Sequence, residues 1–242
     1  MNTIKQNNGF AGDQKINRQI LYKKIGNLKK LLSKYLIFEE NDRALIAGCG
    51  KGDEAFILHE TLSIPIVGID ISLPKENKIK TNNIELLKSD LNAIPFPDNS
   101  FSFIYCYHVL EHVETPSNVL KELHRILQKN KIIFIGFPNR LRITPSYLNS
   151  NLKKGLLNII KQNGKDYWKK ITGKFKNELG AHAGFSEKEF IIMAEKHFQT
   201  IIPIRKEWIK FQYPKYRVLF SFLSILGIAN YFYPSNYYIL KK

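Results

Sequence analysis

The sequence predicts an α/β fold in which helices alternate with the strands of a mostly parallel sheet. Short apolar runs of strand length occur at 44–48, 65–70, 84–87, 101–107 and 132–137. Segments with helical periodicity separate them, at 53–62, 73–80 and 115–129. Strands and helices in this alternation are typical of βαβ units, which form parallel sheets. The fourth and fifth runs are almost continuously apolar, which indicates burial on both faces of the sheet.

Further elements are expected on both sides of this alternating region. Residues 14–37 repeat apolar side chains at helical spacing, which predicts a helical extension over 1–40 ahead of a domain at 41–242. Residues 186–198 open with a capping box, Ser186 with Glu189, and predict another helix. Two more strands are expected at 199–206 and 235–241. The intervening segments, 140–180 and 207–234, are interpreted as helical insertions.

The second insertion contains an uncharged segment, 218–232, with apolar residues on every side. A helix of this length spans only about 22 Å, short of the ~30 Å hydrocarbon core of a bilayer, so a membrane-spanning helix is not expected. Three interpretations stay open. The segment is a buried helix, a lid over an apolar substrate, or an interfacial anchor flanked by Lys210, Lys215 and Arg217.

The chain is strongly basic, with 37 Lys and Arg against 21 Asp and Glu among 242 residues. The excess lies outside 41–139 and suits an anionic membrane, an anionic substrate or nucleic acid, unless it only solvates the surface. Its two cysteines, Cys49 and Cys106, exclude a disulfide scaffold and a four-cysteine zinc site, and both are expected in the core. The polar stretch 1–13 contains no signal segment, so a cytoplasmic location is expected.

A glycine-rich turn follows the first predicted strand. Gly48, Gly50 and Gly52 lie between this strand and a predicted helix, where glycine permits positive φ and a close approach of the backbone to a ligand. Their spacing is G-x-G-x-G. A dinucleotide fingerprint needs its third glycine at Asp53, and no P-loop pattern is present, so nicotinamide, flavin and P-loop nucleotide sites are disfavoured.

Acidic residues follow the next two predicted strands. Asp70 lies 20 residues after Gly50, where a carboxylate can accept hydrogen bonds from both hydroxyls of a ribose. Asp90 ends the third strand, where it can accept a hydrogen bond from the exocyclic amine of an adenine while Leu91 packs on the ring. The glycine turn and the two carboxylates together predict a site for an adenosine ligand.

Several segments carrying these residues resemble the class I S-adenosylmethionine-dependent methyltransferases, in the branch with small-molecule and lipid-related substrates. They are LIAGCGKG, GIDIS, SDLNAIPFPDNSFSFIYCYHVLEHV, LKELHRILQKNKIIFIGFPN and AHAGFSEKEFIIMAEKHF. The resemblance covers roughly 41–139 and 180–206. It implies a Rossmann-like, seven-stranded, mostly parallel sheet with an antiparallel last strand and helices on both faces. It also implies S-adenosylmethionine as cofactor, bound by Gly48, Cys49, Gly50, Gly52, Asp70, Ile71, Asp90, Leu91 and His108.

The chain departs from the family pattern at two places. Family members often carry an acidic residue two positions before the first glycine, where it helps to hold the methionine ammonium, and here that residue is Ile46. The glycine turn before the fifth strand is replaced by 128–130, where Asn130 can still adopt a left-handed conformation.

Histidines are the candidate catalytic residues. If the acceptor is a hydroxyl group, a base is needed, and His108, His112 and His182 are the candidates. Alternatively, His108 packs against the methionine moiety, His112 and Glu111 orient a loop, and His182 caps the next helix. The same region resembles an E-x-x-E-H arrangement linked to a divalent ion in some quinone O-methyltransferases. Because His108 replaces the first carboxylate, no metal is expected.

The sequence leaves the identity of the acceptor open. A basic insertion beside an apolar segment favours a small-molecule or lipid-linked, amphiphilic acceptor, with O-methylation preferred. It also suggests peripheral contact with an anionic membrane through 210–233, on its inner face. RNA methylation is an alternative, but the fourth strand ends in Tyr107-His108 without the motif of base-amine methylation, which argues against nucleic acid. A non-catalytic protein that binds a membrane or a partner is the third alternative.

Overall fold

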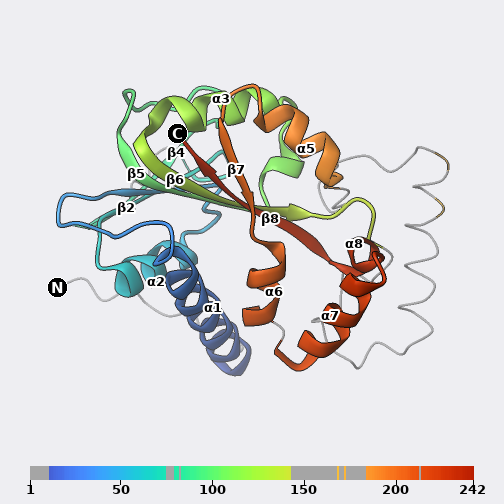
Figure 1. Ribbon diagram of the computed structural model, residues 1–242. Coiled ribbons are helices and arrows are strands. Elements are labelled where there is room, and N and C mark those ends of the chain that lie inside the picture. Colours follow the sequence, from blue (N-terminus) through green and yellow to red (C-terminus); the bar gives the residue numbers. More distant parts are fainter. Residues whose placement is uncertain are drawn as a thin grey trace.

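An eight-stranded sheet forms the centre of the fold in the computed structural model (Figure 1). The structure describes residues 11–74, 79–81, 83–142, 168, 172, 184–212 and 214–242. The strand order is β3-β4-β2-β1-β5-β6-β8-β7. The strands are β1 (Ala44–Ala47), β2 (Ile66–Asp70), β3 (Ile79–Lys80), β4 (Ile84–Lys88), β5 (Phe101–Tyr107), β6 (Leu127–Pro138), β7 (Thr200–Pro203) and β8 (Ser235–Lys241).

The pairing confirms the predicted sheet. Strands β4, β2, β1, β5 and β6 pair in parallel, and β8 lies antiparallel between β6 and β7. These seven strands are therefore mostly parallel, with an antiparallel last strand. The eighth, β3, pairs antiparallel with β4 through a short turn at Thr81. The helix predicted over 73–80 is consequently wrong at its end, because Ile79 and Lys80 hydrogen-bond across to β4 instead of continuing a helix.

Helices cover both faces of the sheet, as predicted. On one face lie α1 (Ala11–Leu32), α2 (Asp53–Leu62) and α6 (Arg205–Gln212), and on the other α3 (Pro116–Ile126) and α5 (Glu187–Ala194) (Figure 1). Two buried apolar clusters result. Trp208 and Phe134 belong to the first and Leu123 and Phe190 to the second. Along β6, Ile133 belongs to the second cluster and Phe134 to the first, because successive strand residues face opposite sides.

Local signals explain several boundaries. The predicted capping box is confirmed: the Ser186 hydroxyl accepts a hydrogen bond from the amide of Glu189, whose carboxylate accepts one from the amide of Ser186. Helix α3 ends at Ile126, earlier than expected, because Leu127 already pairs with Phe101 as the first residue of β6. Asn130 has a φ of 62°, which confirms its predicted left-handed conformation.

The uncharged segment 218–232 forms two helices, α7 (Arg217–Ile225) and α8 (Ala229–Phe232). Gly227, with φ 71°, ends α7: its amide donates to the carbonyl of Ser224, and the amide of Ile228 donates to that of Leu223. The interpretation as a buried helix is wrong, because most apolar side chains of α7 face solvent and only Leu223 is buried. Among the described residues, no helix is long and apolar enough to span a bilayer.

Candidate functional site

The glycine turn between β1 and α2 has the backbone that its sequence predicts. Gly48, Gly50 and Gly52 have φ values of 73°, 54° and 91°. A Cβ atom at Gly48 would lie 2.2 Å from a methyl group of Val109, and one at Gly52 would lie 2.2 Å from a methyl group of Leu86. A Cβ at Gly50 would meet no described atom within 4 Å. A side chain would therefore clash at Gly48 and at Gly52, whereas the space beside Gly50 is open.

Asp70 fixes this turn from the end of β2. One carboxylate oxygen accepts a hydrogen bond from the amide of Gly50 at 2.8 Å, and the other accepts from the amide and hydroxyl of Ser72 at 2.8 and 2.6 Å. Burial alone would raise the pKa of Asp70, but the hydrogen bonds from Ser72 and Gly50 outweigh it and lower the pKa. Asp70 is thus an ionised acceptor at the carboxyl end of the sheet, directly beside the glycine turn.

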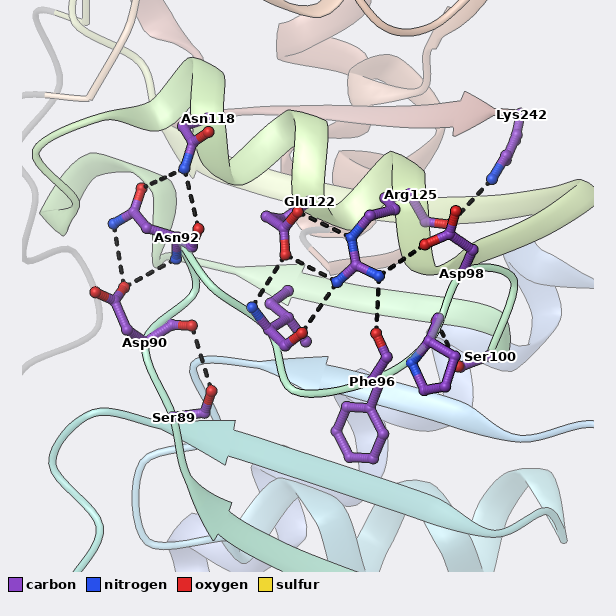
Figure 2. A network of polar contacts seen from close by, with 12 residues as sticks. Ser89, Asp90, Asn92, Phe96, Asp98, Ser100, Asn118, Glu122, Arg125 and Lys242 are labelled. Carbon is purple, nitrogen blue, oxygen red and sulfur yellow. Dashed lines mark hydrogen bonds and ion pairs between the residues drawn. The ribbon is translucent and has the colours of Figure 1, made fainter.

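The second predicted carboxylate, Asp90, follows the neighbouring strand β4. It is exposed and accepts hydrogen bonds from the backbone amide and side-chain amide of Asn92, at 2.9 and 3.1 Å. The side-chain amide of Asn118, on α3, donates to the backbone carbonyl of Asn92 at 3.1 Å, so the position of Asp90 depends on α3 (Figure 2). Ile71 is exposed beside Asp70, whereas Leu91 is buried in the apolar cluster under α3.

Arg125 holds the rest of the loop after Asp90, a role that the sequence did not reveal. Its guanidinium donates to the carbonyl of Phe96 and pairs with Asp98 and Glu122, as Figure 2 shows. It also donates to the carbonyl of Ile94. Glu122 also accepts a hydrogen bond from the amide of Ile94. Hydrogen bonds with Glu122 and Asp98 raise the pKa of Arg125. The loop that carries Asp90 is therefore fixed at both ends to α3.

A cavity of about 270 Å³ lies against the glycine turn. Its wall includes the turn itself, Ile46, Glu54 and Tyr107, together with Leu21 from α1. Asp70, Asp90 and His108 are not part of this wall, although they stand at or just beyond the carboxyl ends of β2, β4 and β5. The N-terminal helix, expected as an extension, thus contributes directly to the site.

Charged and aromatic side chains on this side of the sheet were missed by sequence reasoning. Lys24, on α1, forms an ion pair with Glu54, on α2, and lies 4.2 Å above the centre of the Tyr107 ring. Burial, then the nearby Glu54 carboxylate, raises the pKa of Tyr105 well above its ordinary value. Ile46, at the position where relatives often carry an acid, is buried on the cavity wall. A carboxylate is nevertheless present on the same cavity wall, eight positions further along the chain, at Glu54 in the first turn of α2.

His108 and His112 meet at Glu111. The Nδ1 atom of His108 lies 3.2 Å from Oε1 of Glu111, and the Nε2 atom of His112 lies 4.0 Å from the same oxygen. Glu111 is fully buried, and among the described residues its other oxygen has no hydrogen-bond partner. His108 has a φ of 55°, and its amide donates to the carbonyl of Gly136. The third candidate, His182, lies outside the described residues.

The two cysteines are buried. Burial, then the charge of Asp70, raises the pKa of Cys49 to about 12, and burial also raises the pKa of Cys106. Both thiols are therefore protonated and poorly suited to nucleophilic attack. Across the described part of the chain, no three histidine, cysteine or acidic residues are grouped so as to hold a metal ion.

Comparison with known proteins gives a family match over the first five parallel strands. Residues 45–135 match the family model described as a methyltransferase domain. A probable S-adenosylmethionine-dependent methyltransferase of Mycobacterium tuberculosis is 23% identical over 103 residues, 42% of this chain and 37% of that protein. The demethylmenaquinone methyltransferase of Geobacillus kaustophilus is 33% identical over 97 residues, 36% of this chain and 42% of that protein. The chain thus matches less than half the length of these relatives.

A similar solved structure covers nearly the whole chain. Phosphoethanolamine N-methyltransferase 2 of Haemonchus contortus, in complex with phosphomonomethylethanolamine and S-adenosylhomocysteine, superposes with a TM-score of 0.53 at 14% identity. The superposition covers 97% of this chain and 59% of that one. At this identity the likeness concerns the fold.

Proposed function

We propose that this chain, which contains a class I S-adenosylmethionine-dependent methyltransferase domain, transfers a methyl group from S-adenosylmethionine to a small-molecule acceptor. The match over 45–135 and the order of the seven main strands support this proposal. The observation that carries it is the direct hydrogen bond between Asp70 and Gly50, which joins the open glycine turn to an ionised carboxylate. This pair lies where the sequence predicts the ribose of an adenosine ligand.

The residues present fit the adenosine half of the cofactor. The open position at Gly50 leaves room for a close approach of the ligand to the backbone. Asp70 remains ionised and would accept hydrogen bonds from the ribose hydroxyls. Asp90 is exposed and would accept from the adenine amine, with the exposed Ile71 side chain available to pack on the ring. The buried Leu91 would support the loop from beneath rather than contact the ring.

The cavity beside the turn suits the methionine half. Glu54 on its wall and its partner Lys24 offer opposite charges, which match the ammonium and carboxylate groups of an amino acid. We propose that Glu54 takes the role that an acid at the position of Ile46 has in related proteins. The Tyr107 side chain also lines the cavity, and its ring makes a cation–π contact with Lys24.

The bound sulfonium supplies an activated methyl group, so the protein mainly has to align the acceptor and remove its proton. His108 is the proposed base. In the neutral tautomer whose Nδ1–H donates to Glu111, the Nε2 atom carries no proton and can accept one from the substrate. This arrangement favours an acceptor hydroxyl, hence O-methylation. Glu111 and His112 act through His108, by fixing the orientation of its ring.

The acceptor is proposed to be amphiphilic. The demethylmenaquinone methyltransferase among the relatives supports a small-molecule acceptor. The exposed apolar side chains of α7 and α8, near the end of β6, support an acceptor with an apolar part.

Two measurements test the proposal in sequence. Isothermal titration calorimetry with S-adenosylmethionine and S-adenosylhomocysteine tests cofactor binding, and the absence of binding heat would favour a non-catalytic protein. Mass spectrometry of extracts incubated with the protein and methyl-deuterated S-adenosylmethionine then tests the acceptor. We expect label on the hydroxyl oxygen of a small amphiphile. Label on an RNA nucleoside would refute the proposed acceptor class while leaving the cofactor assignment intact.

A further inference from the structure

The outer side of α7 and α8 carries apolar side chains that no other described element covers. Val218, Phe222 and Ile225 recur at helical spacing and are 81%, 57% and 83% exposed. Other exposed apolar residues of this face are Leu219, Leu226, Ile228 and Tyr231. Soluble monomers rarely expose so many large apolar side chains side by side, so this surface, the α7–α8 face, indicates a contact with something apolar.

The exposure of the α7–α8 face does not mean that α7 is unpacked. The inner side of α7 is already packed: Leu223 is buried, and the Phe220 ring stacks on that of Tyr233 at 5.0 Å. The Ser224 hydroxyl also lies 3.3 Å from the hydroxyl of Tyr233. Helix α7 is therefore apolar on two sides, and within the described part of the chain only one of them is packed against other side chains.

A basic groove runs beside the α7–α8 face. A cavity of about 250 Å³ lies between α6 and α7, and Lys206, Lys210 and Arg217 line it together with Phe220 and Ile225. Among the residues that the structure describes, none of these three cations takes part in an ion pair. The only acidic residue of the sequence after 205 is Glu207, and it pairs with Lys34 at 2.9 Å. The groove thus has positive charge at its rim and apolar walls.

This surface lies at the edge of the sheet that carries the candidate site. Asn139, which follows β6, donates hydrogen bonds to the carbonyls of Asn230 and Tyr233 and so holds α8 against the carboxyl end of that strand. Strand β6 is the direct neighbour of β5, at whose carboxyl end His108 stands. Figure 1 shows α7 and α8 beyond the start of β8, on this side of the molecule.

We propose that the α7–α8 face and the adjoining α6–α7 groove bind the surface of a bilayer that contains anionic phospholipids. Apolar side chains on a short surface helix, flanked by cations, are the combination that holds helices in the plane of a membrane interface. The apolar face would enter the boundary of the acyl chains, and Lys206, Lys210 and Arg217 would contact the anionic headgroups. This goes beyond the proposed function and does not depend on it.

Vesicle sedimentation of the full chain, without cofactor or acceptor, tests the proposal. The vesicles are phosphatidylcholine alone and phosphatidylcholine with phosphatidylglycerol. Ile225→Ser removes one apolar side chain from the face, and Ile37→Ser is its matched control, because Ile37 is 82% exposed elsewhere on the molecule. The double variant Lys210→Gln/Arg217→Gln removes two rim charges. Its control is Lys121→Gln/Lys196→Gln, which removes two exposed lysines from the opposite face of the sheet.

We expect the wild type to sediment with the anionic vesicles and much less with the neutral ones. Ile225→Ser should lower the partition coefficient about tenfold, because the favourable transfer of one isoleucine side chain from water into the membrane is lost. The double charge variant should lower it by about fivefold for each charge, on anionic vesicles only. Both controls should bind like the wild type.

Two results would overturn the proposal. One is a wild type that stays in the supernatant with anionic vesicles. The other is an equal loss of binding in Ile225→Ser and Ile37→Ser. Light scattering after size-exclusion chromatography adds a separate outcome: a dimer that Ile225→Ser dissociates, without vesicle binding, would assign the face to a second copy. None of these results changes the calorimetric test of cofactor binding.

Discussion

Replacing Asp70 by asparagine tests the centre of the candidate site with the smallest change in shape. Asp70 accepts three hydrogen bonds, from the amide of Gly50 and from the amide and hydroxyl of Ser72, at 2.6 to 2.8 Å. Asparagine has one acceptor oxygen, so its NH₂ group must face a donor either at Gly50 or at Ser72. A hydrogen bond to a charged group contributes about 1.5–3 kcal/mol. Because Asp70 is only partly buried, we expect the free energy of unfolding to fall by about 1.5–2 kcal/mol.

The effect on cofactor binding should be larger than the effect on the fold. If Asp70 binds the ribose as proposed, the variant loses the charge-assisted bonds to its hydroxyls and also the fixed position of Gly50. We therefore expect the affinity for S-adenosylmethionine to fall roughly 10- to 100-fold. Urea unfolding measures the first quantity and isothermal titration calorimetry the second. Glu195→Gln, an exposed carboxylate at the end of α5, is the control and should change neither.

Two outcomes of these measurements would contradict the proposed role of Asp70. If Asp70→Asn binds the cofactor within twofold of the wild type at a temperature where both are folded, Asp70 does not contact the ribose. If the affinity is unchanged but the urea midpoint falls, Asp70 only supports the glycine turn. The calorimetric titration then has to be repeated with Asp90→Asn to locate the nucleoside.

Three further perturbations address the surrounding structure. Gly48→Ala should lower the free energy of unfolding by about 2–3 kcal/mol in urea titrations, because φ at this residue is positive and the new Cβ clashes with Val109. Adding Val109→Ala to this variant should recover only the part of the loss that the clash causes. Arg125→Met should lower the free energy of unfolding by about 2 kcal/mol and speed amide hydrogen exchange in the loop after β4. An unchanged exchange rate would mean that Arg125 does not hold this loop. Burial would raise the pKa of Asp42, but hydrogen bonds from a backbone amide and from Lys131 lower it below its ordinary value. The stability this provides is present above about pH 4 and lost as pH falls through the lowered pKa, so the drop in urea midpoint between pH 6 and pH 3 should be smaller in Asp42→Asn.

The parts of the fold that were predicted correctly depend on short stretches of sequence. Runs such as 101–107 are long enough and apolar enough to identify buried strands without knowledge of their neighbours. The positive φ values at the glycine turn follow from spacing within five residues. Ser186 and Glu189 lie one helical turn apart, so their capping box is also visible in the sequence. The helix expected over 73–80 is wrong at its end, because Ile79 and Lys80 pair with β4 there, whereas 75–78 lie outside the described residues.

The parts that were missed depend on contacts between distant residues. Lys24 and Glu54 are 30 positions apart and meet only because α1 packs on α2. Arg125 contacts a loop about 30 residues earlier in the chain. The exposure of α7 could not be predicted either, because an uncharged apolar segment looks the same in the sequence whether it packs in a core or lies on a surface.

The backbone conformation of His108 lowers the stability of the fold, while its side chain serves the candidate site. A non-glycine residue with φ near 55° costs about 1–2 kcal/mol. Glycine at 108 would release that strain and raise the melting temperature, but it would also delete the imidazole that contacts Glu111 and Tyr107. A more heat-resistant His108→Gly protein with little transferase activity would mean that this residue is retained for its ring, at the expense of a tighter native state.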